Sequence, residues 1–151
     1  MIEKTIESAE RELKLNFFHW SETTWKVKEE FIKRVIDLDF KLKIAVVINP
    51  INPSAELERI LNHLIVERKI DTIFIDGKKP RWYERKIKKI LKYKGVSLRK
   101  ARTVKCKQCA GIRLSDLLAG LSRWYFDRKN IEKIEKYFLK IKKKTIVILS
   151  N

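Results

Sequence analysis

The sequence has few cysteines and no long apolar segment. Its two cysteines, Cys106 and Cys109, are too few for a secreted disulfide framework, so we expect a reducing, cytoplasmic location. The longest apolar runs, such as residues 44–48, are too short to span a bilayer, and no signal peptide is visible. The sequence therefore predicts a cytoplasmic protein with no membrane partner.

Acidic residues are also scarce. The 19 Asp and Glu residues face 36 Lys and Arg residues, which leaves a formal net charge of +17. Charge of this size indicates a polyanionic partner, above all nucleic acid, whose phosphates release counterions on binding. The alternative is a structural thermophile domain rich in Lys, Ile and Glu, with Gln108 as its single glutamine.

The hydrophobic pattern predicts one α/β domain over residues 1–151. Helical spacing of apolar residues predicts helices at about 2–14, 24–37, 53–65, 80–94, 112–126 and 131–141. Runs rich in β-branched residues predict strands at about 41–48, 70–75, 96–104 and 145–149. This alternation favours a mostly parallel sheet with helices on both faces.

Most of the net positive charge lies in one segment, residues 78–107. It contains fourteen basic residues and one acid, Glu84. Basic residues scattered over the sequence would serve solubility equally well. Their concentration in one segment therefore indicates a nucleic-acid contact. The candidate residues from this segment are Lys78, Lys79, Arg81, Trp82, Arg85, Lys88 and Lys89. Exposed aromatics here could stack on unpaired bases, although Tyr83 suits the core and Trp82 could instead cover a helix end.

Asp76 ends a predicted strand, and the carboxyl ends of strands are where α/β sheets place ligands. Its carboxylate could bind a metal, or it could cap the turn through Gly77.

Asp116 lies in a helix otherwise suited to burial, residues 111–120. A buried carboxylate needs a partner, so Arg113 could pair with it, or the site could contain a metal or another polar network.

No zinc site, Gly-rich phosphate loop or nucleophilic triad is predicted. Cys106 and Cys109 have the spacing of a zinc knuckle, but no second such pair exists, and only His19 and His63 could complete four ligands.

Residues 111–120, Gly-Ile-Arg-Leu-Ser-Asp-Leu-Leu-Ala-Gly, resemble the Gly-Ile-Gln-Leu-Ala-Asp-Leu-Ile-Ala-Gly signature of the family called domain of unknown function 3800. Arg113 and Ser115 are the departures. The resemblance extends to residues 18–21, to the strand 42–48 and to the strand that ends at Asp76, and so covers most of the chain.

The resemblance implies a ribonuclease H-like fold and a nuclease that uses Mg²⁺ or Mn²⁺ to hydrolyse phosphodiesters. Asp76 and Asp116 would be metal ligands, with His19 nearby as a further catalytic candidate. Arg113, in the signature helix, joins the candidate nucleic-acid contacts.

Two departures from the family pattern affect the enzymatic prediction. Members usually begin with a strand carrying Asp-Glu-Ser-Gly, and this chain starts after it, so we expect an N-terminally truncated domain. An acidic residue often stands two positions before the histidine, where this chain has Phe17, and Glu22 is a candidate substitute. Two carboxylates alone bind divalent cations weakly. A relative that binds nucleic acid without cutting it is therefore the alternative.

Overall fold

The computed structural model describes residues 1–48 and 52–150, and only the backbone of 53, 54 and 147–150. The chain divides into two compact units. We call Met1–Leu42 with Cys106–Ile146 the helical unit, and Lys43–Lys105 with the chain from Val147 onward the mixed unit. That these units act as one domain over 1–151 stays a prediction.

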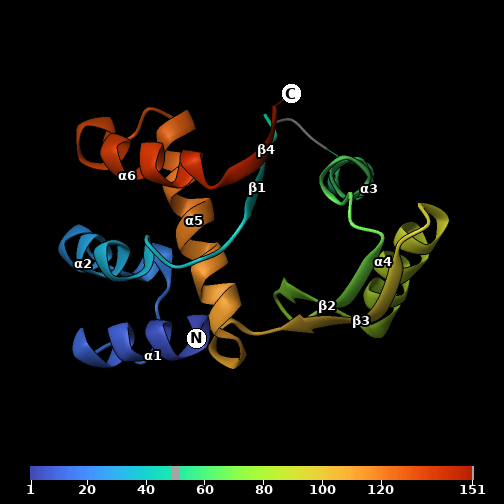
Figure 1. The fold of residues 1–151 in the computed structure, drawn as a ribbon, viewed down its shortest axis with the longest axis horizontal. Helices are drawn as coiled ribbons and strands as arrows, with labels where there is room; N and C mark the ends of the chain where they lie inside the picture. The colour runs from blue at the N-terminus through green and yellow to red at the C-terminus, as the bar shows by residue number, and fades with distance from the viewer. Residues whose placement is uncertain (49–51, 151) are drawn as a thin grey trace. The chain divides into compact units, whose positions relative to one another are not determined.

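The helical unit is built around one long helix (Figure 1). Its elements are α1 (Ile2–Glu12), η1 (Trp20–Glu22), α2 (Trp25–Val35), η2 (Cys106–Gln108), α5 (Ala110–Phe126) and α6 (Ile131–Lys143). Helix α5 contacts α1, α6, η1 and η2. It can do so because it buries residues on several sides, among them Ile112, Leu114, Leu117, Leu118 and Leu121.

Aromatic pairs fill the core of the helical unit. Phe18 stacks on Phe31 with ring centroids 4.3 Å apart, and Tyr125 stacks on Phe138 at 3.8 Å. The three phenylalanines are almost fully buried. Each such side chain stabilises the fold by roughly 1.5–3 kcal/mol relative to exposure.

A buried ion pair joins the two sequence segments that make up the helical unit. The Arg113 guanidinium on α5 contacts both carboxylate oxygens of Glu10 on α1, at 2.6 and 2.9 Å. Glu10 also accepts the Phe18 N–H, and Arg113 donates to the Cys106 carbonyl. Both charged side chains are about 95% buried, and these extra hydrogen bonds supply the partners that a buried pair requires.

The mixed unit contains α3 (Pro53–Leu64), β2 (Lys69–Asp76), α4 (Arg81–Tyr93) and β3 (Ser97–Val104). β2 and β3 pair in parallel, from Lys69 opposite Ser97 to Asp76 opposite Val104, and α4 connects them. A second two-stranded sheet pairs β1 (Leu42–Val46) with β4 (Thr145–Ser150). The described residues thus form two small sheets where the sequence predicted one.

Helix α4 packs on its strands through an apolar side. Ile87 and Leu91 are fully buried, and they form a core cluster with Val96 and Ala101. Partly buried residues of β2, β3 and α3 surround this cluster. Gly95, at φ +84°, ends the helix, because a left-handed backbone there suits glycine. The chain then turns directly into β3.

The predicted helices and strands are confirmed in type, and most boundaries lie within two residues of the prediction. The α/β class is therefore correct. None of the helices within residues 1–48 and 52–150 is long and apolar enough to cross a membrane.

Candidate nucleic-acid interface

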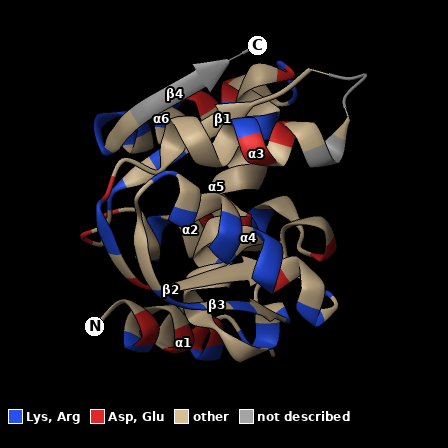
Figure 2. Cartoon of the chain, turned by 90° about the vertical axis from the view of Figure 1, so that its right-hand side faces the viewer, with Lys and Arg blue, Asp and Glu red and all other residues tan. Residues whose placement is uncertain are grey.

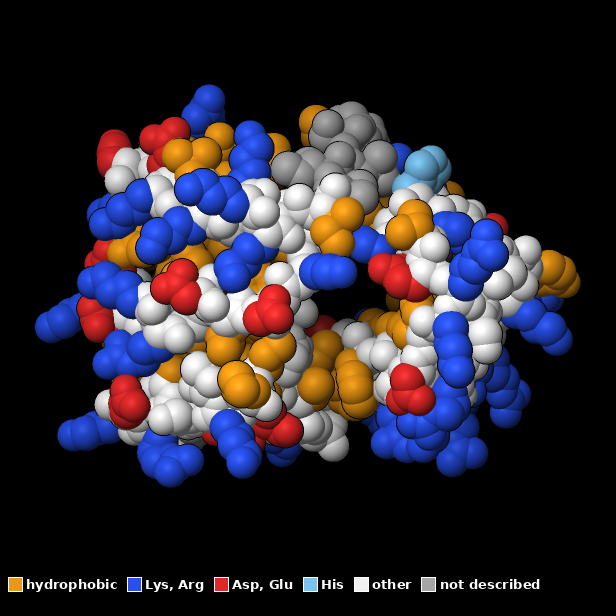
Figure 3. Space-filling model, viewed as in Figure 1, with side chains coloured by type: hydrophobic (Ala, Val, Ile, Leu, Met, Phe, Trp, Pro, Cys, Tyr) orange, Lys and Arg blue, Asp and Glu red, His pale blue; other side chains and the backbone are white. Residues whose placement is uncertain are grey.

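Four cations lie along one side of α4, and we call them the basic stripe: Arg81, Arg85, Lys88 and Lys92. Their spacing of four, three and four residues puts them on one side of a helix, over about 16 Å of its length. All four are exposed, whereas Ile87 and Leu91 point to the core. Figure 2 shows the basic residues along the outer side of α4. Figure 3 also shows Lys and Arg side chains gathered over this helix and β3.

Among the described residues, the four cations of the basic stripe form no ion pair. Across the described ranges, 1–48 and 52–150, no carboxylate forms an ion pair with any of its four members, nor with Lys78, Lys79 or Lys89. Other cations of the segment do have partners. Arg99 on β3 pairs with Asp71 on β2, and Lys94 donates to backbone carbonyls at the end of α3. The stripe is thus available to an external anion.

Glu84, the only acid of the segment, has a structural role. Its Oε1 accepts the Thr103 N–H at 2.9 Å and the Thr103 hydroxyl at 3.2 Å, which ties α4 to β3. The hydrogen bond from the Thr103 N–H holds the pKa of Glu84 below its usual value, and the charges of Lys78 and Lys88 lower it further. Glu84 therefore stays ionised while it stabilises the helix that carries the stripe.

Two aromatic side chains are exposed beside the stripe. Trp82 is 60% exposed and Tyr93 82% exposed, and the Lys89 Nζ lies 5.8 Å from the Tyr93 ring centroid. Tyr83 packs against the core, as the sequence predicted, and meets Trp82 edge to face. The arrangement combines cations with aromatic faces, the two components of single-strand binding surfaces.

Asp76 lies at the carboxyl end of β2 in the mixed unit, where it is exposed. Gly77 follows with φ +86° and donates its N–H to the Val104 carbonyl at the end of β3. Asp76 therefore stands at the carboxyl-end edge of a parallel strand pair, two residues before Lys78. In α/β sheets this is the edge where ligands commonly bind.

Asp116 belongs to the helical unit, where it holds η1 in place. Its Oδ2 accepts the Trp20 N–H at 2.7 Å, and it is partly buried. From the sequence, Arg113, a metal or another polar group could be the partner of Asp116. The contact that the structure shows is the Trp20 N–H, whereas Arg113 pairs with Glu10. His19 and Glu22 flank this contact: the His19 Nδ1 lies 2.9 Å from the Ser21 Oγ, and Glu22 is exposed.

The interpretation of Arg113 as a nucleic-acid contact is not supported by its surroundings. Its side chain is 3% exposed, and Glu10 occupies its guanidinium. A phosphate could not reach this group without breaking a buried ion pair, so Arg113 has a structural role.

The described residues do not supply a complete metal site. No group of three or more His, Cys, Asp or Glu side chains that could hold a metal ion is found among them. Asp76 and Asp116 lie in different units. Cys106 begins η2, and Cys109 is the N-cap of α5.

Sequence reasoning missed Lys92 of the stripe. The available signal was its spacing of four residues from Lys88 and seven from Arg85, which continues the same side of the helix.

Comparison with models of protein families, with curated proteins and with solved structures finds no match for this chain. The resemblance of residues 111–120 to a nuclease-like family stays a prediction. Function must be inferred from the chain's own residues.

Proposed function

We propose that the chain binds nucleic acid through the basic stripe of α4. The observation that carries this proposal is four exposed cations on one side of one helix, none of which forms an ion pair with any residue that the structure describes. Lys78, Lys79 and Lys89 add positive charge beside the stripe. Lysine and arginine contacts to phosphates supply most of the affinity of sequence-independent binding.

Trp82 and Tyr93 favour an unpaired strand as the ligand. Their exposed rings lie beside the cations, and base stacking on an aromatic face typically contributes about 1–3 kcal/mol per base. A duplex keeps its bases stacked and offers only its backbone. We therefore expect single strands to bind more tightly than duplex of the same length.

The salt dependence of binding tests the proposal. In a variant with all four stripe residues changed to Gln, fewer counterions are released, so the slope of log K against log salt should become shallower by about 3 for a single strand. Fluorescence anisotropy with a labelled oligonucleotide, over a series of salt concentrations, measures this slope.

A variant that removes the same charge elsewhere is the control. Lys133, Lys140, Lys142 and Lys143 are exposed on α6 of the helical unit. Their change to Gln should leave the slope near that of the unmodified protein. Equal slopes for the α4 and α6 variants would refute a specific role of the stripe. Failure of the unmodified protein to bind at any salt concentration would favour the structural thermophile domain.

Metal-dependent cleavage, with a ribonuclease H-like fold, is the second candidate. The observation in its favour is the Asp116–Trp20 hydrogen bond, which joins two blocks of the family resemblance, residues 18–21 and 111–120. Because the described residues contain no complete ligand set, binding without cleavage takes first place. With the proposed binding of nucleic acid we also propose the cytoplasmic location that the two cysteines lead us to expect.

Incubation of a labelled oligonucleotide with Mg²⁺ or Mn²⁺ tests this candidate. An active enzyme should yield cleavage products that Asp116→Asn and Asp76→Asn each abolish. Products that persist in both variants would come from a contaminant or another site, and this candidate would then be wrong.

A further inference from the structure

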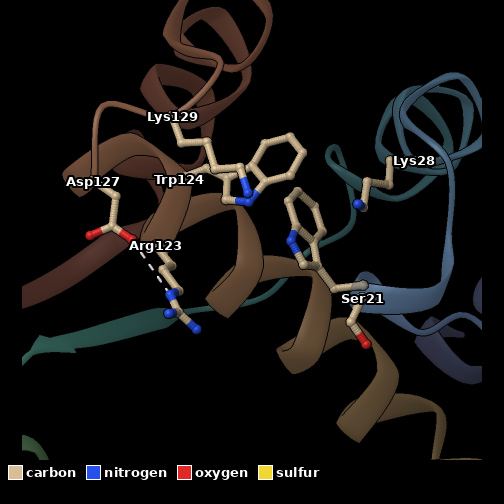
Figure 4. Close-up of a pocket in the computed structure, with 7 residues that line it drawn as sticks. Ser21, Lys28, Arg123, Trp124, Asp127 and Lys129 are labelled. Carbon is tan, nitrogen blue, oxygen red and sulfur yellow. Dashed lines mark ion pairs between the residues drawn. The ribbon is translucent and has the colours of Figure 1, made fainter.

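A cavity of about 470 Å³ opens on the helical unit (Figure 4). This volume lies within the range of small-molecule pockets, roughly 300–1,000 Å³. Its lining combines two indoles, three cations and one carboxylate: Trp20, Trp124, Lys28, Arg123, Lys129 and Asp127. The lining comes from η1, α2, α5 and the turn after α5.

Lys28 is the most unusual residue of the cavity. It is only 6% exposed, and its Nζ lies 4.6 Å from the Trp20 ring centroid and 4.7 Å from that of Trp124. No carboxylate forms an ion pair with it among the described residues, which include the whole helical unit. The indoles stabilise the ammonium through their faces but do not neutralise it.

The electrostatic surroundings of Lys28 are unfavourable to its charge. Burial lowers the pKa of Lys28, and the nearby charge of Lys129 lowers it further, whereas Asp116 acts in the opposite direction. A bound anion would offset both the energetic cost of burying the Lys28 ammonium and its repulsion from Lys129.

The rest of the lining adds to the positive surplus. The Lys129 Nζ lies 5.3 Å from the Trp124 ring centroid, on the same cavity. Asp127, the one acid, already pairs with Arg123 at 3.5 Å. Three cations and one carboxylate leave the lining with more positive than negative charge. Asp116, outside the lining, offsets part of this surplus, and an anionic ligand would balance the rest.

We propose that this cavity binds a phosphate monoester, with Lys28 and Lys129 contacting its oxygens. Such a group carries a charge of about −1.5 to −2 at neutral pH, opposite in sign to the surplus of the lining. The indoles provide an apolar wall for the organic part of the ligand. A free mononucleotide and the phosphorylated end of a strand share this chemistry, and only the second source rests on the proposed function.

Titration with a nucleoside 5′-monophosphate tests the proposal, with the unphosphorylated nucleoside as ligand control. The protein should carry the four Gln substitutions in the stripe of α4, so that this surface does not contribute. Calorimetry and tryptophan fluorescence should both show saturable binding of the monophosphate and none of the nucleoside. The outcome is thus independent of whether α4 binds nucleic acid.

Lys28→Met, which keeps most of the length of the side chain and removes its charge, should weaken this binding about tenfold or more, as expected for the loss of a charge-assisted contact. Lys129→Gln, at an exposed position, should also weaken binding and gives a second test that does not depend on a buried substitution. Lys133→Gln, on α6 outside the cavity, should leave binding unchanged.

A single-stranded oligonucleotide with a 5′-phosphate, compared with the same strand ending in a hydroxyl, distinguishes the two sources. Tighter binding of the phosphorylated strand that depends on Lys28 would support the proposal and identify the strand end as a ligand. If neither phosphorylated probe binds in a way that depends on Lys28 or Lys129, the proposal is wrong.

Discussion

The helical unit and the mixed unit use their charged residues in different ways. In the helical unit, Arg113 and Glu10 are buried together, and the Lys28 ammonium lies against two indoles. In the mixed unit, the stripe from Arg81 to Lys92 is exposed and forms no ion pair with the residues described there. Residue type alone therefore does not reveal a cation's role. Burial and partners decide whether it stabilises the fold or is available to a ligand.

If this comparison is correct, the largest loss of stability should come from Glu10→Gln. The change leaves the buried Arg113 charge uncompensated, and the free energy of unfolding should fall by about 3 kcal/mol or more. Urea unfolding followed by circular dichroism measures it. Glu3→Gln, at an exposed position of the same helix, should have almost no effect. Similar losses in both variants would contradict the structural role of the pair.

Gly120→Ala should have the next largest effect. A Cβ at this position would overlap the Trp20 indole, so the substitution should destabilise the protein by about 1–3 kcal/mol. Gly111→Ala, in the same helix, meets only an ordinary contact at 3.7 Å from the Cys109 Sγ and should not destabilise. The loss at Gly120 should shrink when Trp20 is changed to Leu. Additive losses in the double variant would show that the indole is not the cause.

A pH dependence should come from Tyr137 of the helical unit. Burial, together with the hydrogen bond to Glu29, raises its pKa from 10.0 to about 12. The folded chain then holds this proton more tightly than the unfolded chain, so stability should decrease as pH rises from 10 toward 12. Difference absorbance of the phenolate against Tyr137→Phe measures the midpoint. A midpoint near 10 would mean that the phenol is accessible to solvent.

The smallest effect on stability should come from the four stripe substitutions on α4. The side chains are exposed, and removing like charges spaced at three and four residues relieves repulsion. Unfolding free energy should therefore stay within about 0.5 kcal/mol or rise. A large loss would show that the stripe stabilises the mixed unit, and the contrast between the units would then fail.

Much of the site on α4 could be predicted from the sequence, since its cations are neighbours along one helix. Arg81, Arg85 and Lys88 were expected on a helix, and the structure has them there, exposed. That they contact nucleic acid stays a prediction. Arg113 was assigned to the same surface, and its burial shows why this failed: its partner, Glu10, stands 103 positions away.

Local order therefore followed from the sequence alone. The helices, the strands and the exposed side of α4 depend on periodicities within about a dozen neighbouring residues, which the chain displays directly. Only the tertiary structure decided that Arg113 is paired and that Lys28 lies against Trp20 and Trp124. These outcomes depend on contacts between residues far apart in the chain, and periodicity contains no information on which distant side chains will meet.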